Sequence, residues 1–192
     1  MLKLTDITKI YQVGDLKVEA LKGVSLEFRK SEFVSILGPS GCGKTTLLKI
    51  LMKDYRPDSG YFKFGANLFT GYFDQVQAKL DLNKTAIDEV WSAFPAMTET
   101  MIRNALAAFL FKGDDVYKVL SNCSGGERAR IALLKLMLGR FNFLLLDEPT
   151  NHLDAFSREE LENTLLNYSG TMLIVSHDRY FINKLATSVL EL

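Results

Sequence analysis

Cysteine, proline and long apolar runs are all scarce in this chain. Among its 192 residues there are two cysteines, four prolines and one tryptophan, and two cysteines cannot build the disulfide framework of a small secreted protein. No run approaches the roughly 18 apolar residues of a membrane-spanning helix, and the first residues lack the apolar stretch of a secretion signal. We therefore expect a cytoplasmic protein with no direct membrane span.

An excess of charge of one sign is also missing. The 23 basic and 23 acidic residues cancel, which argues against a surface that binds nucleic acid everywhere by bulk electrostatics. The hydrophobic content of 47% is higher than that of disordered chains. The length suits one domain that is large enough to bury a sizeable core.

The patterns that are present alternate between strand and helix. Residues 24–28 alternate apolar and polar side chains, as in a half-buried strand. Three short apolar runs, at 33–37, 141–146 and 171–175, are typical of strands buried on both faces. Such runs, separated by helical segments, indicate βαβ units and a mostly parallel sheet. Polar residues follow each run, so we expect one ligand site at the carboxyl edge of this sheet.

The middle of the chain has a helical period instead. Thr98 and Ser124 are candidate caps for two helices there, and residues 158–168, between the second and third buried runs, predict a third helix. The apolar faces that we expect on the first and third of these helices are Met101, Ile102, Ala105, Leu106 and Phe109, and Leu161, Leu165 and Leu166. We predict a single α/β domain over residues 1–192, with an antiparallel β part at the N-terminus. Its α/β core would comprise residues 1–75 and 139–192, and a helical subdomain would occupy about 76–138.

The most specific motif follows the first buried run. Residues 38–45 fit the pattern G-x-x-x-x-G-K-[ST], in which glycines let backbone N–H groups point at phosphate oxygens. Lys44 supplies a positive charge for the phosphates, and the Thr45 hydroxyl can ligate Mg²⁺. A glycine-rich turn is the alternative, but the place between a strand and a helix favours a nucleoside-triphosphate site in a P-loop NTPase core. The candidate residues are Gly38, Pro39, Ser40, Gly41, Cys42, Gly43, Lys44 and Thr45.

Two acids end the second buried run. Asp147 and Glu148 emerge from an apolar strand, where carboxylates are costly unless a cation or a reaction needs them. We expect Asp147 to hold Mg²⁺, directly or through water, and Glu148 to polarise the water that attacks the γ-phosphate. The alternative is a strand end with solvated acids.

Two further residues are candidates by position. His177 ends the third buried run, on the same predicted edge as Lys44 and Glu148, and could donate a hydrogen bond to the γ-phosphate and orient the attacking water. Gln75 follows an aromatic strand-like stretch, and its amide could ligate Mg²⁺ or hold a water. A structural histidine and an exposed turn glutamine are the respective alternatives.

Residues 124–127, Ser-Gly-Gly-Glu, read first as a capping box that opens a helix. Two glycines in a first turn cost roughly 1 kcal/mol each relative to alanine. That cost is tolerated where a backbone must approach a ligand closely, and a helix N-terminus with bare amides is an anion site. Because the chain has a single triphosphate loop, Ser124, Gly125 and Gly126 suggest contact with the γ-phosphate of another subunit's nucleotide.

Together these motifs resemble those of an ATP-binding cassette (ABC) nucleotide-binding domain over nearly the full length. Residues 38–46, through Thr46, are similar to the Walker A loop, Gln75 to the Q-loop glutamine, 124–127 to the signature motif, 143–148 to Walker B, 151–154 to the D-loop, and His177 to the switch histidine. Tyr11 matches the aromatic residue that stacks on adenine. The resemblance implies MgATP hydrolysis by a head-to-tail homodimer, with two ATP molecules between each Walker A loop and the partner's signature.

The two parts of the chain resemble different branches of that family. Residues 1 to about 60 are similar to exporter cassettes of the lipoprotein-release and macrolide-efflux kind, and the chain from about Gly65 on is similar to ABC-F translation factors. A chimeric or engineered chain is therefore one interpretation. The exporter branch implies a membrane-domain partner, and the ABC-F branch implies the ribosome.

Three functions follow from the sequence. The first is a dimeric ATPase in which Lys44, Glu148 and His177 are catalytic. The second is a truncated or engineered module that binds ATP with little turnover, and the third is an ABC-F-type translation factor module. A rate of phosphate release that rises faster than linearly with protein concentration would distinguish the first from the second.

Overall fold

The computed structural model describes residues 2–74, 79–151 and 153–192. The chain forms two compact units. The first comprises residues 1–72, 141–148 and 169–192, and the second comprises 73–140 and 149–168. Gln75 lies outside the described residues.

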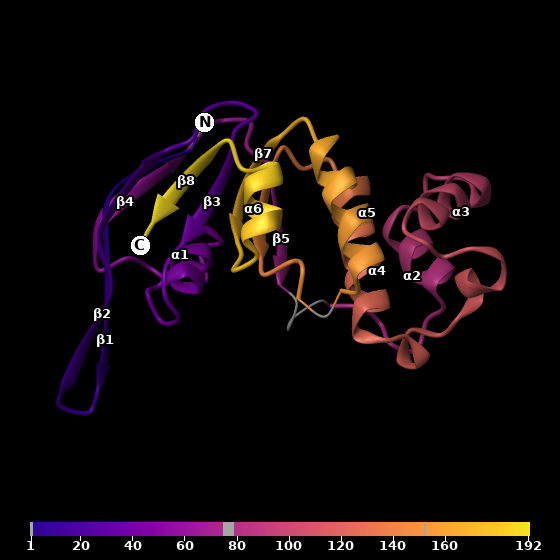
Figure 1. Cartoon of the computed structure of the whole chain (residues 1–192), viewed down its shortest axis with the longest axis horizontal. Coiled ribbons are helices and arrows are strands. Elements are labelled where there is room, and N and C mark those ends of the chain that lie inside the picture. The colour runs from indigo at the N-terminus through magenta and orange to yellow at the C-terminus, as the bar shows by residue number, and fades with distance from the viewer. Residues whose placement is uncertain (1, 75–78, 152) are drawn as a thin grey trace. The chain divides into compact units, whose positions relative to one another are not determined.

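The first unit contains a three-stranded antiparallel sheet in the order β2-β1-β4 (Figure 1). The strands β1 (Leu2–Val13), β2 (Leu16–Glu27) and β4 (Ser59–Phe64) form it, and β1 and β2 make a long hairpin. This confirms the antiparallel N-terminal part. Gly14 occupies the hairpin turn with φ +62°, a conformation that glycine adopts without a steric cost.

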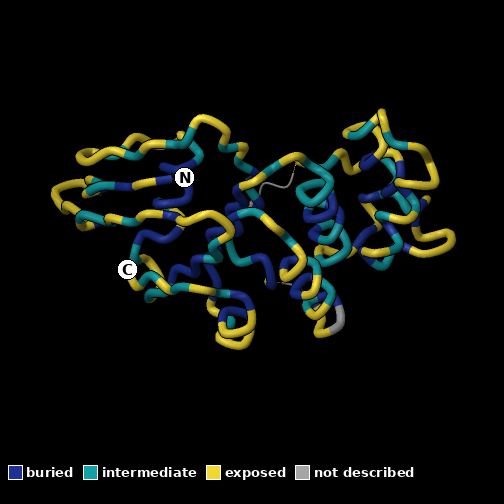
Figure 2. Tube along the Cα trace, turned by 90° about the horizontal axis from the view of Figure 1, so that it is seen from above, coloured by how far each residue is buried: buried dark blue, intermediate teal, exposed yellow. Residues whose placement is uncertain are grey.

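A second sheet has the strand order β5-β6-β7-β3-β8. Its strands are β3 (Phe33–Leu37), β5 (Thr70–Asp74), β6 (Phe143–Asp147), β7 (Thr171–Val175) and β8 (Ser188–Glu191). The pairs β3–β7, β6–β7 and β3–β8 are parallel, as the sequence predicts. Residues of β3, β6 and β7 join β1, β2 and helix α1 (Lys44–Leu51) in one apolar core, and the buried stretches are dark blue in Figure 2. Helix α6 (Arg179–Leu185) links β7 to β8.

The second unit is helical, and its helices begin at side-chain caps. It contains α2 (Ala86–Ala93), α3 (Glu99–Ala108), α4 (Gly125–Leu138) and α5 (Ala155–Leu166), with short 3₁₀ turns at Gly113–Tyr117 and Leu120–Asn122. Thr98 and Ser124 cap α3 and α4 as predicted, and Thr85 and Asp154 cap the other two. In the described residues we find no helix with the length and apolar character to cross a membrane.

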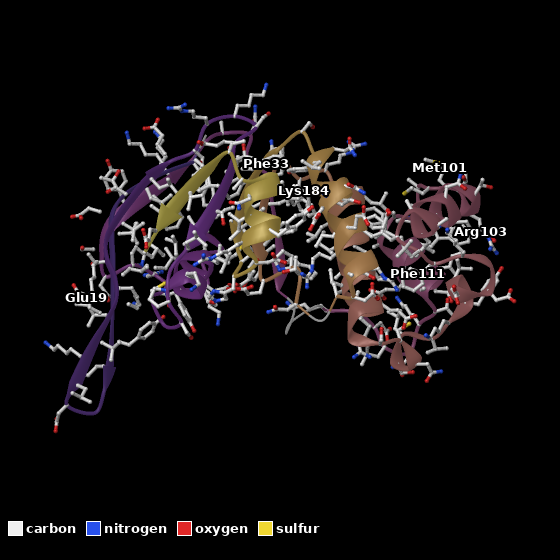
Figure 3. All side chains as sticks on the ribbon, viewed as in Figure 1. Glu19, Phe33, Met101, Arg103, Phe111 and Lys184 are labelled. Carbon is white, nitrogen blue, oxygen red and sulfur yellow. The ribbon has the colours of Figure 1, made fainter. Side chains whose placement is uncertain are left out.

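Two predicted apolar faces need correction. Met101 on α3, labelled in Figure 3, is 51% exposed, and Leu166 at the end of α5 is 47% exposed. Ile102 and Leu106 of α3, and Leu165 of α5, are buried as predicted. The buried face of each helix is therefore narrower than its apolar pattern suggests.

Candidate active site

The register of the parallel sheet brings three strand ends together. Val175 at the end of β7 pairs with Ile36 of β3 on one side and with Asp147 of β6 on the other. The residues that follow β3, β6 and β7 therefore leave the same edge of the sheet. At this edge the sequence predicts the ligand site, and the ends of all three strands belong to the first unit.

The loop at residues 38–43 joins β3 to α1 and curls as glycines allow. Gly41 and Gly43 have φ values of +84° and +95°, which side-chain-bearing residues rarely adopt. A Cβ atom on Gly43 would also lie 2.1 Å from the carbonyl oxygen of Ala20. Both backbone angle and space thus require glycine immediately before α1.

Lys44 starts α1 and is held inside this loop. Its Nζ donates hydrogen bonds to the carbonyl oxygens of Gly38 (2.6 Å) and Pro39 (3.0 Å), and the residue is only 7% exposed. The ammonium group is therefore a fixed positive charge at the N-terminal end of a helix, where the helix dipole also favours an anion.

Thr45 and Asp147 come from distant parts of the sequence and meet at this edge. The Thr45 hydroxyl donates to Oδ2 of Asp147 at 3.2 Å. A hydroxyl and a carboxylate beside a phosphate loop are the hard oxygen ligands that Mg²⁺ prefers. The residues present therefore fit this cation.

Glu148 occupies a strained position one residue beyond β6. Its φ is +46°, a left-handed value that costs free energy for a residue with a side chain and is frequent at functional sites. Its N–H donates to the carbonyl of Val175 at 2.8 Å, which fixes the turn. The turn directs the carboxylate to His177, whose N–H donates to Oε2 at 3.3 Å and whose Nε2 lies 3.3 Å from Oε1.

Burial has the largest effect on the pKa of the Glu148 carboxyl group. It raises the pKa of Glu148 above its usual value, and the nearby Asp147 raises it further, while His177 and Lys44 oppose the shift. A half-buried carboxylate with a raised pKa is a better proton acceptor than a solvated one.

Tyr11 lies on β1, close to the start of α1. Its hydroxyl is 3.4 Å from Oγ1 of Thr46, and its ring meets Tyr55 edge-on with a centroid distance of 6.4 Å. Tyr11 and Thr46 thus belong with the phosphate loop in the first unit, where an aromatic ring could contact a base.

The motif at residues 124–127 belongs to the second unit. Oγ of Ser124 accepts from the N–H of Glu127 at 3.1 Å, and the N–H of Ser124 donates to Oε2 of Glu127 at 2.6 Å, so the predicted capping box forms. A Cβ atom on Gly125 would meet nothing within 4 Å. Packing among the described residues therefore does not require glycine at this position.

Lys118, which the sequence does not mark as a site residue, contacts the same motif. Its Nζ donates to both carboxylate oxygens of Glu127, at 2.9 and 3.0 Å. No periodicity or motif marks Lys118 in advance, because its place near the start of α4 depends on the two short 3₁₀ turns between which it lies.

Comparisons with known proteins agree with this geometry. The sequence profile of the ABC transporter family matches residues 21–151. YdiF of Bacillus subtilis is 50% identical over 97% of this chain and 31% of its own length. ABC transporter F family member 5 of Arabidopsis thaliana is 43% identical over 88% of the chain, and the energy-dependent translational throttle protein EttA of Escherichia coli is 38% identical over all of it. The chain spans about a quarter to two fifths of the length of such relatives.

A solved structure has the same fold. The dimeric ATP-binding cassette MJ0796, in a post-hydrolysis state with ADP and Pi, superposes with a TM-score of 0.84 at 26% identity. The superposition covers 100% of this chain and 94% of MJ0796. This confirms the predicted fold class. The YdiF match covers both the exporter-like and the ABC-F-like parts, and a chimeric origin stays a prediction.

Proposed function

This chain belongs to the ABC transporter family of ATP-binding domains, and from that premise we propose that it hydrolyses MgATP as a head-to-tail dimer of two copies. The observation that supports this most directly is the meeting of Thr45 and Asp147, 3.2 Å apart, beside the loop that holds Lys44. A phosphate cradle, a cation-ligand pair and a carboxylate with a raised pKa then share one sheet edge.

Nucleotide binding uses the loop and its neighbours. The backbone N–H groups of residues 38–46 and the Lys44 ammonium bind the β- and γ-phosphates, and Tyr11 stacks on the adenine. Thr45 and Asp147 would hold Mg²⁺, with Gln75 as a further proposed ligand. When bound there, Mg²⁺ would supply positive charge to offset the charge that develops on the phosphates during transfer.

Hydrolysis is assigned to Glu148 and His177. Glu148 accepts a proton from the water that attacks the γ-phosphate, and burial raises its pKa toward the range of an effective general base. His177 contacts that carboxylate through its backbone N–H and its imidazole. It therefore orients the base and can donate to the γ-phosphate, whose negative charge Lys44 also stabilises.

The second copy supplies Ser124, Gly125 and Gly126. Gly125 has open space where a side chain would stand, and Ser124 caps the 14-residue helix α4, whose N-terminal amides favour an anion. MJ0796 is a dimer in its state with bound ADP and Pi, which agrees with a nucleotide site shared between two copies.

Enzyme concentration tests the dimer. We expect the rate of phosphate release per chain to rise with protein concentration and then level off, because the active species contains two copies. Light scattering should show twice the monomer mass with ATP and the monomer mass without ATP. A small rate per chain that is independent of concentration would indicate a module that binds ATP without forming the enzyme.

The partner of the whole protein is a separate proposal. The likeness to EttA, whose name describes a translational throttle, and to an F family member of Arabidopsis thaliana favours the ribosome over a membrane domain. We expect the chain to co-sediment with ribosomes at low salt in the presence of a slowly hydrolysed ATP analogue. Binding to membrane vesicles that carry an ABC membrane domain, with none to ribosomes, would favour the exporter branch.

A further inference from the structure

The start of α4 presents an electrostatic difficulty. Under the proposed function its first amides bind the triphosphate of a second copy, yet the third residue of the helix is a glutamate. Oε2 of Glu127 accepts the N–H of Ser124 at 2.6 Å, so the carboxylate is fixed directly beside the proposed anion site. A carboxylate and a phosphate held close together repel each other, and an uncompensated carboxylate would therefore weaken phosphate binding.

Lys118 lies where it can remove that difficulty. Its ammonium group spans both oxygens of Glu127, at 2.9 and 3.0 Å, and the two side chains are only 35% and 22% exposed. Screening by water and salt is therefore weaker than for a surface pair such as Lys3–Glu27, whose side chains are 58% and 55% exposed.

The backbone holds Lys118 in this place. Its N–H donates to the carbonyl of Asp115 at 3.1 Å, within the first 3₁₀ turn, and its carbonyl accepts the N–H of Ala86 at 3.0 Å, at the start of α2. Val119 and Thr85 form a β-bridge beside it. The first 3₁₀ turn and the start of α2, both in the second unit, therefore hold the backbone of Lys118 in place.

The charge states agree with this pairing. Burial raises the pKa of Glu127, but hydrogen bonds from Lys118 and Ser124 outweigh it, and the pKa lies below its usual value. The hydrogen bond to Glu127 raises the pKa of Lys118. Both groups are thus charged at neutral pH, and their charges cancel.

We propose that Lys118 is a positioning residue that neutralises Glu127, so that the N-terminus of α4 can accept the triphosphate held by a second copy. This inference rests on the proposed dimeric function. It separates two roles of Glu127: its carboxylate completes the capping box, while Lys118 cancels the negative charge that the box brings to the anion site.

Replacing the lysine tests the proposal. In Lys118→Met we expect the ATP concentration for half-maximal turnover and for dimer formation to rise about tenfold, with the affinity of the dilute monomer for ATP unchanged. Lys118→Arg should stay near wild type because it keeps the charge. Lys3→Met removes a lysine from an exposed ion pair and serves as the matched control, with no expected change.

The double variant Lys118→Met, Glu127→Gln distinguishes charge compensation from simple support of the loop. Glutamine keeps an acceptor for the N–H of Ser124 and carries no charge, so the double variant should match Glu127→Gln alone and recover the dimer affinity that Lys118→Met loses. It also contains no unpaired charge, so it remains informative if Lys118→Met folds poorly in a thermal melt.

Failure of the Lys118 proposal and failure of the proposed dimer give different results. A double variant that dimerises as weakly as Lys118→Met, or a Lys118→Met chain with wild-type dimer affinity, overturns the role of Lys118. A wild-type chain that binds ATP but never dimerises instead overturns the proposed function, and the Lys118 variants are not needed to reach that conclusion.

Discussion

Glu148→Gln should bind MgATP as tightly as wild type, release phosphate at least about 100-fold more slowly, and accumulate as a dimer. General-base catalysis contributes about 10² to 10⁴ in rate, and glutamine cannot accept the proton. The substitution is nearly isosteric and preserves an acceptor for the N–H of His177, which the Glu148 carboxylate binds at 3.3 Å. Phosphate release measures the rate, calorimetry measures the affinity, and light scattering measures the dimer.

The same chemical change on an exposed strand provides the control. Glu27, on β2, is 55% exposed in its side chain and pairs only with Lys3 among the ion pairs found in the described part of the chain. Glu27→Gln should therefore leave affinity, rate and mass unchanged. Turnover of Glu148→Gln within a few fold of wild type would remove Glu148 from its proposed role.

The position of the candidate site at the carboxyl edge of the sheet could be predicted, because parallel pairing aligns the ends of the strands. The sequence alone identifies three buried runs, and parallel pairing then requires their carboxyl ends to lie along one edge. Thr45 and Asp147 are 102 residues apart, yet their hydroxyl and carboxylate meet at 3.2 Å because α1 and β6 both begin or end at that edge. Local motif and sheet geometry were sufficient for this part of the site.

Features that depend on tertiary packing were not predictable. The pairing of Lys118 with Glu127 arises from two 3₁₀ turns whose sequence has no periodic signal. The need for glycine at position 43 comes partly from the carbonyl of Ala20, on another strand. The exposure of Met101 and Leu166 depends on which part of each helix its neighbours cover, and an apolar period does not encode that coverage.

The left-handed backbone at Glu148 is another feature that the sequence does not predict. Nothing in the local sequence favours φ +46° for a glutamate, and in this conformation its N–H donates to the carbonyl of Val175 on the adjacent strand. Backbone strain at the proposed base is consistent with function rather than with stability.

Gly125→Asp should abolish ATP-driven dimerisation and turnover while leaving both the fold and ATP binding by the monomer intact. The Cβ atom at this position meets nothing within 4 Å, and an acidic residue in the first turn of a helix is compatible with its dipole. The new carboxylate would instead repel and obstruct the triphosphate of the second copy. Phosphate release should fall at least about 100-fold, a loss comparable to removal of the base, and thermal melting and calorimetry check the fold and the monomer affinity.

Mixing this variant with Glu148→Gln decides whether the two copies are arranged head to tail. Each variant alone has two defective sites per dimer, but a mixed dimer pairs the intact Glu148 and loop of the Gly125→Asp chain with the intact residues 124–126 of the other chain. Random pairing would make half of the dimers mixed, each with one of its two sites restored, which sets an upper limit of about a quarter of wild-type activity. Activity should return but stay below this limit, because Gly125→Asp weakens pairing and Glu148→Gln chains pair stably with each other. If both partial sites lay within one chain, each chain in the mixture would keep its own defect, and mixing would restore nothing.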